Sequence, residues 1–282
     1  MKHMGKLLVL LLSATLALTA CGGQPSGSSE SGSTTEASTS GQSESVDNNR
    51  VLYERILAEV PTFDPFGTND IVTQRVHYQI FDTLFLETQE GDLIPSVCSE
   101  YSFNDAGDVL TFTIREGMKF HDGNAITPED VAFSLNTAIA SSYTSRSTST
   151  MESAEVVDGN KVALKLKYAF APILSCLVNV NCAIVPKAAY EADPDAFGKN
   201  PVGSGPYMLG EVVSGETITL HAFSDYWRGE AAIKTIVGKI IPDNTAALMA
   251  LESGELDIMQ PSQDYSDRER LQNNPDVVYY EA

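Results

Sequence analysis

Residues 110–123 read LTFTIREGMKFHDG, and three residues later the chain continues with TPEDVAFS at positions 127–134. Apolar and polar residues alternate from Val109 to Arg115, which predicts a half-buried strand. Asp122-Gly123 supplies a turn, in which we expect His121 to bond local backbone groups. Thr127 can cap a helix that begins at Pro128, with two acids at the positive end of its dipole. The stretch therefore predicts a strand, a turn and a well-capped helix.

Outward from this stretch, strands dominate the middle of the chain and helices interleave at both ends. Turn residues predict hairpins around Gly159-Asn160 and Ser214-Gly215, and helices begin after Asn69-Asp70 and Pro242-Asp243. The pattern predicts a mixed α/β fold. Its other expected strands are Val51–Ala58, Leu84–Glu87, Cys98–Phe103, Leu256–Met259 and Val277–Tyr280.

The 282-residue chain carries a formal net charge of −20. Binding of nucleic acid or of anionic lipid through a basic face requires clustered Lys and Arg, so the charge argues against both. Hydrophobic residues make up 43% of the sequence, which is enough to build one large core or two modest ones.

The N-terminus is typical of an exported protein. Lys2, His3 and Lys6 precede an apolar run that is too short to span a bilayer, and the run ends in LTACG at 18–22. This ending resembles a bacterial lipobox, which implies that residues 1–20 are a signal peptide and that Cys21 is lipidated. An ordinary secretory peptide that happens to contain a cysteine is the alternative. Residues 21–49 are rich in Ser, Thr and Gly, and we expect a disordered tether.

Three further cysteines lie in apolar surroundings. Outside the cytoplasm a disulfide between Cys176 and Cys182 is permitted, and it would close a small loop. Equally, Cys98, Cys176 and Cys182 can be small buried hydrophobic residues.

Five stretches in order resemble the family 5 extracellular solute-binding proteins, which bind dipeptides, oligopeptides and nickel. The most specific is 110–134, quoted above. The others are TFDP (62–65) with IFDTL (80–84), LIPS (93–96) with EY (100–101), NPVGSGPY (200–207) with DYWRG (225–229), and TAALMALESGELD (245–257). Together they cover residues 51 to about 260.

The resemblance implies a periplasmic-binding-protein-like fold of type II with an extra domain. It places domain I at 50–68 and 200–282, and an inserted domain II at 69–199. Family members are longer, so this chain is expected to be the first lobe only, truncated before the second. The acid that pairs with a peptide's amino terminus in the family lies in that second lobe. The chain alone is then expected to bind peptide weakly or not at all.

The function that this implies is a lipid-anchored substrate-binding component of an ABC importer, capturing oligopeptides or dipeptides for uptake. Its partners would be the ABC permease, its ATPase and the membrane, through the acyl group on Cys21. It would be a monomer without a cofactor, at the cell surface or the periplasmic face of the bacterial cytoplasmic membrane. A nickel chelate or another small solute is the alternative ligand.

The ligand-binding candidates are Thr62, Phe63 and Asp64, with Arg146 and Tyr207. The loop 62–64 follows a strand and could pair with an extended peptide by strand addition. A rigid turn, with Asp64 capping the backbone of residue 66 or 67, is the alternative. Arg146 could meet an anionic group or be a solvated loop residue. Trp227 could stack on a ligand or pack at the base of domain I.

A surface-anchored hydrolase is the rival function, and the residues do not favour it. The mature chain has only His77, His121 and His221, at wide spacing, whereas metal hydrolysis needs three or four convergent ligands. Gly203-Ser204-Gly205 lacks the Lys of a phosphate loop and does not fit a nucleophile elbow. We expect these glycines to permit a tight chain crossing, and we expect no enzyme and no metal site.

Overall fold

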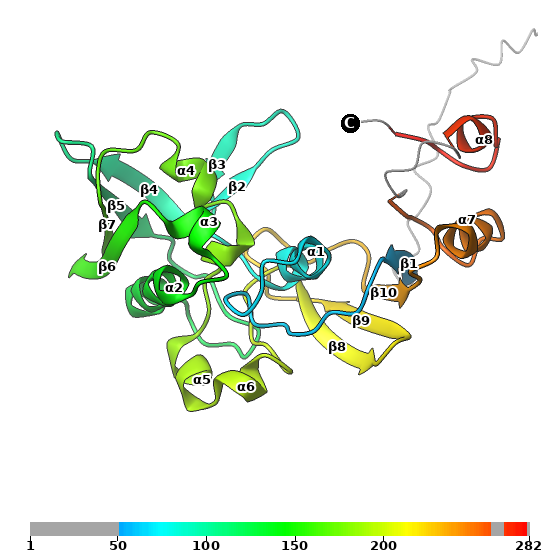
Figure 1. The fold of residues 1–282 in the computed structure, drawn as a ribbon. Coiled ribbons are helices and arrows are strands. Elements are labelled where there is room, and N and C mark those ends of the chain that lie inside the picture. The colour runs from blue at the N-terminus through cyan, green and yellow to red at the C-terminus, as the bar shows by residue number, and fades with distance from the viewer. Residues whose placement is uncertain (1–50, 261–267, 281–282) are drawn as a thin grey trace, which may run out of the picture. The chain divides into compact units, whose positions relative to one another are not determined.

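The computed structural model describes residues 51–260 and 268–280. The predicted signal peptide (1–20), the tether (21–49) and Cys21 lie outside the described residues. Helices and strands alternate along the described chain, which confirms the mixed α/β prediction (Figure 1). Strands form two four-stranded sheets and one two-stranded sheet.

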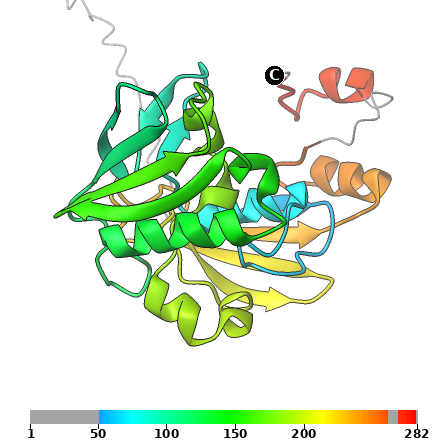
Figure 2. The ribbon, with the colours of Figure 1, turned by 60° about the vertical axis from the view of Figure 1, so that its left-hand side comes forward.

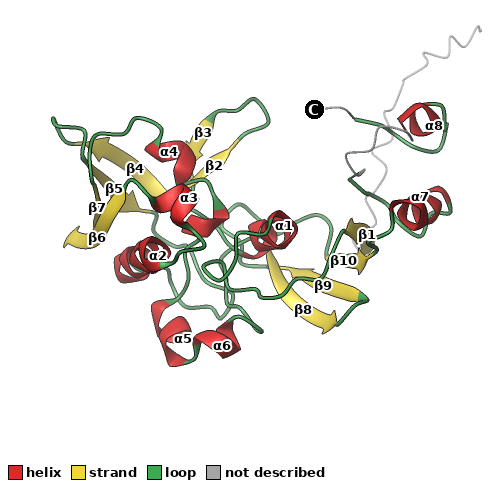
Figure 3. Ribbon diagram, viewed as in Figure 1, coloured by secondary structure: helices red, strands yellow, loops and turns green. Residues whose placement is uncertain are grey.

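The first sheet has the order β1-β10-β9-β8. Its first strand pairs in parallel with β10, and the other pairings are antiparallel. It therefore joins the start of the described chain to a strand far along the sequence, with Val51 opposite Thr235 (blue β1 beside orange β10 in Figure 1). Figure 3 shows these strands as one group of arrows and β4 to β7 as another. The bounds are β1 Val51–Ile56, β8 Tyr207–Val213, β9 Thr217–Ala222 and β10 Thr235–Ile240.

The second sheet is antiparallel throughout, in the order β4-β5-β7-β6. The predicted alternation is clear in β5, where Leu110, Phe112 and Ile114 are buried. A separate short hairpin precedes this sheet. The bounds are β2 Phe85–Glu87, β3 Leu93–Pro95, β4 Cys98–Phe103, β5 Val109–Ile114, β6 Met151–Asp158 and β7 Lys161–Leu166.

Helix α2 (Pro128–Ala140) packs along β6 and β7 of the second sheet (Figure 2). Its start is the one predicted: the Thr127 hydroxyl accepts from the Asp130 amide, and the Asp130 carboxylate accepts from the Thr127 amide. The remaining helices are α1 Ile71–Ile80, α3 Ser145–Thr148, α4 Ile173–Cys176, the 3₁₀ turn η1 Val180–Cys182, α5 Lys187–Ala192, α6 Pro194–Phe197, α7 Asn244–Glu252 and α8 Arg268–Gln272.

Two large clusters of buried apolar side chains form the cores. One lies on the second sheet and includes Phe85, Phe112 and Leu164. The other lies on the first sheet and also takes in Val76 and Ile80 of α1, together with residues between 138 and 197. Residues on both sides of the predicted domain boundaries at 68/69 and 199/200 thus pack in the first sheet's core. Those boundaries stay a prediction.

Two expected strands are absent from the described chain. Leu256–Met259 makes only one isolated parallel bridge, between Glu54 and Ile258, and Val277–Tyr280 has no strand partner. Val278 and Tyr280 are 75% and 87% exposed. Both predictions were wrong: Leu256–Met259 pairs with β1 over too few residues to form a strand, and Val277–Tyr280 meets no strand among the described residues.

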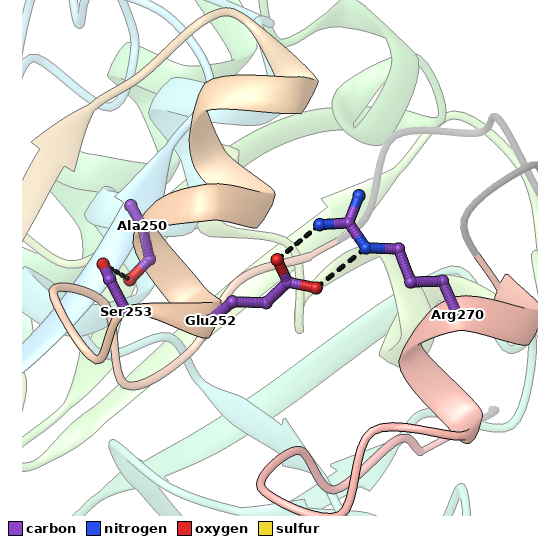
Figure 4. A network of polar contacts seen from close by, with 4 residues as sticks. All are labelled: Ala250, Glu252, Ser253 and Arg270. Atoms are coloured by element: carbon purple, nitrogen blue, oxygen red, sulfur yellow. Dashed lines mark hydrogen bonds and ion pairs between the residues drawn. The ribbon is translucent and has the colours of Figure 1, made fainter.

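Helix α7 is capped by Asp243 as predicted, and its end is joined to α8 by an ion pair. Figure 4 shows the Arg270 guanidinium approaching both carboxylate oxygens of Glu252, with an Nε–Oε1 distance of 2.8 Å. The nearby Ser253 hydroxyl donates to the Ala250 carbonyl. This bidentate geometry fixes α8 against α7. None of the helices in the described ranges is long and apolar enough to cross a membrane.

Candidate functional site

A pocket of about 280 Å³ lies between the end of β1, helix α1 and the segment Ile258–Gln260. We call it the β1–α1 pocket. Its floor is built by backbone pairing: the Arg55 amide donates to the Ile258 carbonyl at 3.1 Å, and the Ile258 amide donates to the Tyr53 carbonyl at 3.2 Å. The two segments therefore meet like neighbouring strands, although only one bridge forms.

Arg55 borders the pocket but is held by the protein. Its Nε donates to the Ile241 carbonyl at 2.8 Å, and its two other nitrogens donate to Pro242 and Asn244. A guanidinium whose donors are used in this way supports the turn before α7. Its role is structural.

Glu54 is the unusual residue of β1. Side chains alternate along a strand, so Glu54 shares a face with Leu52 and Ile56, both of which pack in the first sheet's core. The carboxylate lines the pocket without a hydrogen bond or ion pair to any described residue. Burial raises the pKa of Glu54, and the positive charge of Arg75 partly opposes this shift.

Arg75 comes from α1, whose start is fixed by the Asp70 carboxylate accepting from the Thr73 amide. The helix buries Val76 and Ile80 and leaves Arg75 exposed beside the pocket. The guanidinium has no hydrogen bond or ion pair within the described ranges. Two opposite charges thus line one pocket without bonding each other.

Apolar side chains supply much of the remaining wall. Leu57 is 42% exposed and Ile258 is 53% exposed, and Val72 and Met259 lie beside them. Tyr78 is 42% exposed, and its hydroxyl accepts from the Val180 amide at 3.3 Å. Exposed apolar groups around a few polar ones are typical of a small-molecule site.

The loop with Thr62, Phe63 and Asp64 is a rigid turn beside the first sheet's core. Phe63 is 5% exposed and packs in that core, so its side chain does not reach solvent as a ligand contact would require. The Asp64 carboxylate accepts from the Phe66 amide at 2.9 Å and from the Tyr190 hydroxyl at 3.0 Å. Burial raises the pKa of Asp64, and these two hydrogen bonds partly offset it. The turn predicted as the alternative is thus formed at Asp64 and Phe66, and pairing of the loop backbone with a peptide stays a prediction.

The other two ligand candidates do not line the β1–α1 pocket. Tyr207 is 8% exposed, and its hydroxyl donates to the Ile233 carbonyl at 3.0 Å within the first sheet. Arg146 is exposed on the short helix α3, not in a loop as expected. The structure therefore does not bring the predicted candidates together.

Instead, the motif glycines form the expected tight crossing. A Cβ on Gly203 would lie 1.9 Å from the Ile80 carbonyl oxygen, so the chain passes there only without a side chain. His121 clamps this crossing: Nδ1 accepts from the Gly203 amide at 3.2 Å and Nε2 donates to the Gly205 carbonyl at 3.0 Å. These partners are 82 and 84 positions away, so the expectation of local partners was wrong.

A buried carboxylate completes the crossing. Asp82 is 2% exposed; its backbone amide donates to the Ser204 hydroxyl at 3.3 Å, and its carboxylate accepts from the Tyr226 hydroxyl at 3.1 Å. Burial raises the pKa of Asp82 to about 7, partly opposed by Tyr226, Trp227 and Arg228. Trp227 packs against the second sheet's core, not at the base of domain I as expected.

The cysteine pair forms no disulfide in the structure. Cys98, Cys176 and Cys182 are free thiols, and Cys182 is fully buried whereas Cys176 is half-buried. This fits the alternative that these residues are small hydrophobic ones. Within the described ranges no group of three or more His, Cys, Asp or Glu side chains is placed to hold a metal ion.

The comparison with family models decides what kind of protein this is. Residues 92–282 match the model described as bacterial extracellular solute-binding proteins, family 5 middle. The chain belongs to this family. Its fold is accordingly the periplasmic-binding-protein fold, as the sequence motifs indicated.

Named relatives of this family 5 chain bind peptides. The oligopeptide-binding protein AppA of Bacillus subtilis is 27% identical over 278 residues, covering 95% of this chain and 50% of AppA. The glutathione-binding protein GsiB of Escherichia coli K12 is 28% identical, covering 71% of this chain and 40% of GsiB. The chain therefore spans half or less of the length of these relatives.

A solved structure of a binding protein is also similar to this chain over about half of its own length. The periplasmic binding protein DppA from Helicobacter pylori, in complex with the peptide STSA, has a TM-score of 0.73 and 25% identity. The match covers 80% of this chain and 49% of DppA.

The sequence predictions did not include Glu54 and Arg75, the two charged residues of the β1–α1 pocket that have no bonded partner among the described residues. A signal for Glu54 was present, because it interrupts the apolar face shared by Leu52 and Ile56. Arg75 gave no such signal, since a charged residue on a helix surface is ordinary. Only the packing of α1 beside β1 brings the two together.

Proposed function

We propose that this chain belongs to the substrate-binding component of an ABC importer and that the β1–α1 pocket contributes to the capture of a peptide. The observation that carries the proposal is the pocket itself: an apolar wall with one unpaired carboxylate and one unpaired guanidinium, among the described residues. A peptide offers the complementary groups, which are apolar side chains and charges of both signs. Peptide ligands of AppA and DppA support the same class.

The site would act by binding alone. A ligand in the pocket would be held by burial of apolar surface and by hydrogen bonds to charged groups. Among the described residues, neither Glu54 nor Arg75 is bonded to a nucleophile or to a base. Delivery to a permease and its ATPase completes the proposed function.

Methyl NMR of the purified, isotope-labelled chain tests this proposal. We expect the peptide Ser-Thr-Ser-Ala to shift the methyl signals of Leu57, Val72 and Ile258. The signals of Val162 and Leu164, buried in the second sheet's core, serve as internal controls. Peptide shifts confined to residues far from the pocket, or no shift at millimolar peptide, would count against the proposal. A Ni²⁺–histidine titration tests the alternative ligand.

We further propose that Cys21 carries the acyl anchor and holds the protein at the outer face of the bacterial cytoplasmic membrane. The support is the lipobox-like sequence at residues 18–22. Expression of the full chain in bacteria fed a labelled fatty acid should label the wild type and leave Cys21→Ala unlabelled. Equal labelling of both would refute the anchor and leave the peptide site untouched.

A further inference from the structure

Glu54 occupies a position that a strand normally gives to an apolar residue. It lies between Leu52 and Ile56 on the face of β1 that packs toward the core, and its own side chain is only partly exposed. Partial burial of a carboxylate without a partner is costly, and such a group in a pocket is a candidate for ligand binding. The Glu54 carboxylate is therefore a candidate to bind a group of the ligand.

The charged and titratable groups around Glu54 do not neutralise it by contact. Arg75 of α1 acts on it through space, and the Tyr207 hydroxyl, which also senses the charge of Glu54, donates instead to the Ile233 carbonyl. The neighbouring Arg55 is bonded to the turn before α7. Within the described residues the carboxylate therefore keeps its acceptor sites for a molecule that enters the pocket.

The surroundings of the carboxylate favour one kind of entering group. Leu57, Val72 and Ile258 offer apolar surface next to it, which suits the aliphatic stem of a long side chain. The net charge of −20 attracts cations to the protein as a whole. An ammonium or guanidinium on an aliphatic stem matches both features; an anionic side chain could meet only Arg75, which is exposed, and would be repelled by the net charge.

We propose that Glu54 is a specificity residue, which receives the cationic side chain of a lysine- or arginine-containing peptide while the stem of that side chain lies on Leu57 and Val72. This inference rests on the proposed peptide-binding function and names the ligand class within it. Arg75, at the rim of the same pocket, weakens the attraction through space and discourages a second cation.

Three tripeptides of equal length test the assignment: Ala-Lys-Ala, Ala-norleucine-Ala and Ala-Glu-Ala. Norleucine keeps the lysine stem and removes its charge. With the full chain and the methyl signals of Leu57, Val72 and Ile258 as the readout, we expect the lysine peptide to bind at least fivefold more tightly than the norleucine peptide. The glutamate peptide should bind most weakly of the three.

Variants distinguish the effect of Glu54 on lysine preference from the effect of the protein's overall negative charge. Glu54→Gln should abolish the preference for lysine over norleucine and keep binding of the norleucine peptide. Glu59→Gln, an exposed acid on the segment that follows β1, should leave the preference unchanged. Arg75→Gln should increase the preference. In the wild type, the preference for lysine should also decline as pH falls from 7 to 4, because Glu54 becomes protonated. This measurement does not depend on whether a variant folds.

The outcomes distinguish this inference from the proposed function. Equal affinity for lysine and norleucine peptides, or an unchanged preference in Glu54→Gln, overturns the assignment of Glu54 and leaves peptide binding in place. A preference lost equally in Glu59→Gln also overturns it, because overall charge then explains the result. No binding of any tripeptide at millimolar concentration overturns both, because weak binding by this chain would still shift the methyl signals at that concentration.

Discussion

At the residue scale, two buried titratable side chains, Asp82 and His121, stabilise the chain crossing. Burial shifts their pKa values in opposite directions, and each shift favours the neutral form. His121 accepts through Nδ1 and donates through Nε2, which requires a neutral ring, and burial lowers its pKa to about 4. Asp82 is buried beside Ser204, and burial raises its pKa to about 7. The stretches that carry the family resemblance meet here, so their residues serve the fold at this point.

Replacement of Asp82 by Asn should change how stability depends on pH. The folded-state pKa of Asp82 is raised, so its contribution is fully present below the unfolded pKa of 3.8 and is lost as pH rises through about 7. The Asn side chain does not titrate, so Asp82→Asn loses no stability at this position as pH rises. Between pH 5 and pH 8 the stability of Asp82→Asn relative to wild type should rise by about 2–3 kcal/mol.

Urea unfolding at several pH values measures this difference. His77 and His121, whose lowered pKa values remove stability as pH falls from 6.5 toward 4, are present in both proteins and cancel. A stability difference that stays constant from pH 5 to pH 8 would show that Asp82 is not protonated in the folded state.

Gly203→Ala should be strongly destabilising, because its Cβ would lie 1.9 Å from the Ile80 carbonyl oxygen, and backbone cannot give way as a side chain can. We expect a loss of about 3 kcal/mol or more in the free energy of unfolding. Gly67→Ala is the matched control, since the nearest atom there is the Asp64 carboxylate oxygen at 3.2 Å. Similar midpoints for the two variants in thermal unfolding would contradict the tight crossing.

At the element scale, α2 protects an edge of the second sheet. Strand β6 ends the order β4-β5-β7-β6, so one row of its backbone groups has no strand partner. The Asn136 side chain of α2 donates to the Ala154 carbonyl at 2.7 Å and accepts from the Ala154 amide at 2.9 Å. The amide thus takes the place of a neighbouring strand at this point, which hinders pairing with another chain.

Removal of that amide should cost stability and increase self-association. Asn136→Ala leaves both backbone groups of Ala154 without their partner, and we expect a loss of about 1–3 kcal/mol. Asn136→Asp keeps the acceptor and removes the donor, so its stability should lie between that of the wild type and that of Asn136→Ala. Thr137→Ala is the control on the same helix. Urea unfolding and light scattering at high concentration measure the series; an Asn136→Ala protein as stable and as monodisperse as Thr137→Ala would refute the protective role.

At the scale of the whole molecule, the second sheet's core buries the three described cysteines to different degrees. Cys98 lies in the second sheet's core with its thiol donating to the Leu84 carbonyl, and Cys182 is fully buried, whereas Cys176 is half-buried. Burial raises the pKa of Cys98 and Cys182 to about 12. A thiol reacts as its thiolate, so both should be inert in the folded protein.

Thiol titration checks this arrangement. In a chain that carries Cys21→Ser, Ellman's reagent should modify one thiol rapidly under native conditions, that of Cys176, and three after unfolding in guanidinium. The native rate should disappear in Cys176→Ser. Only one reactive thiol after unfolding would show that Cys176 and Cys182 are joined, against the free thiols of the structure.

The sequence by itself determined the local elements and the family. The Thr127 cap, the alternation of Val109–Ile114 and the hairpin turns depend on neighbours in the chain, so they could be predicted correctly. The motif glycines also gave the tight crossing. The strand predictions failed for two segments with strand-like residues: Leu256–Met259 pairs with β1 at one bridge only, and Val277–Tyr280 has no strand partner among the described residues.

Only the tertiary structure decided which side chains meet. The side chains of Phe63 and Tyr207 are buried, and their predicted ligand contacts stay predictions; Glu54 and Arg75, 21 positions apart, line one pocket. Strand and helix periods follow from the geometry of the backbone over a few residues. Burial and pockets depend on packing between segments that are remote in sequence, and no local pattern specifies that packing.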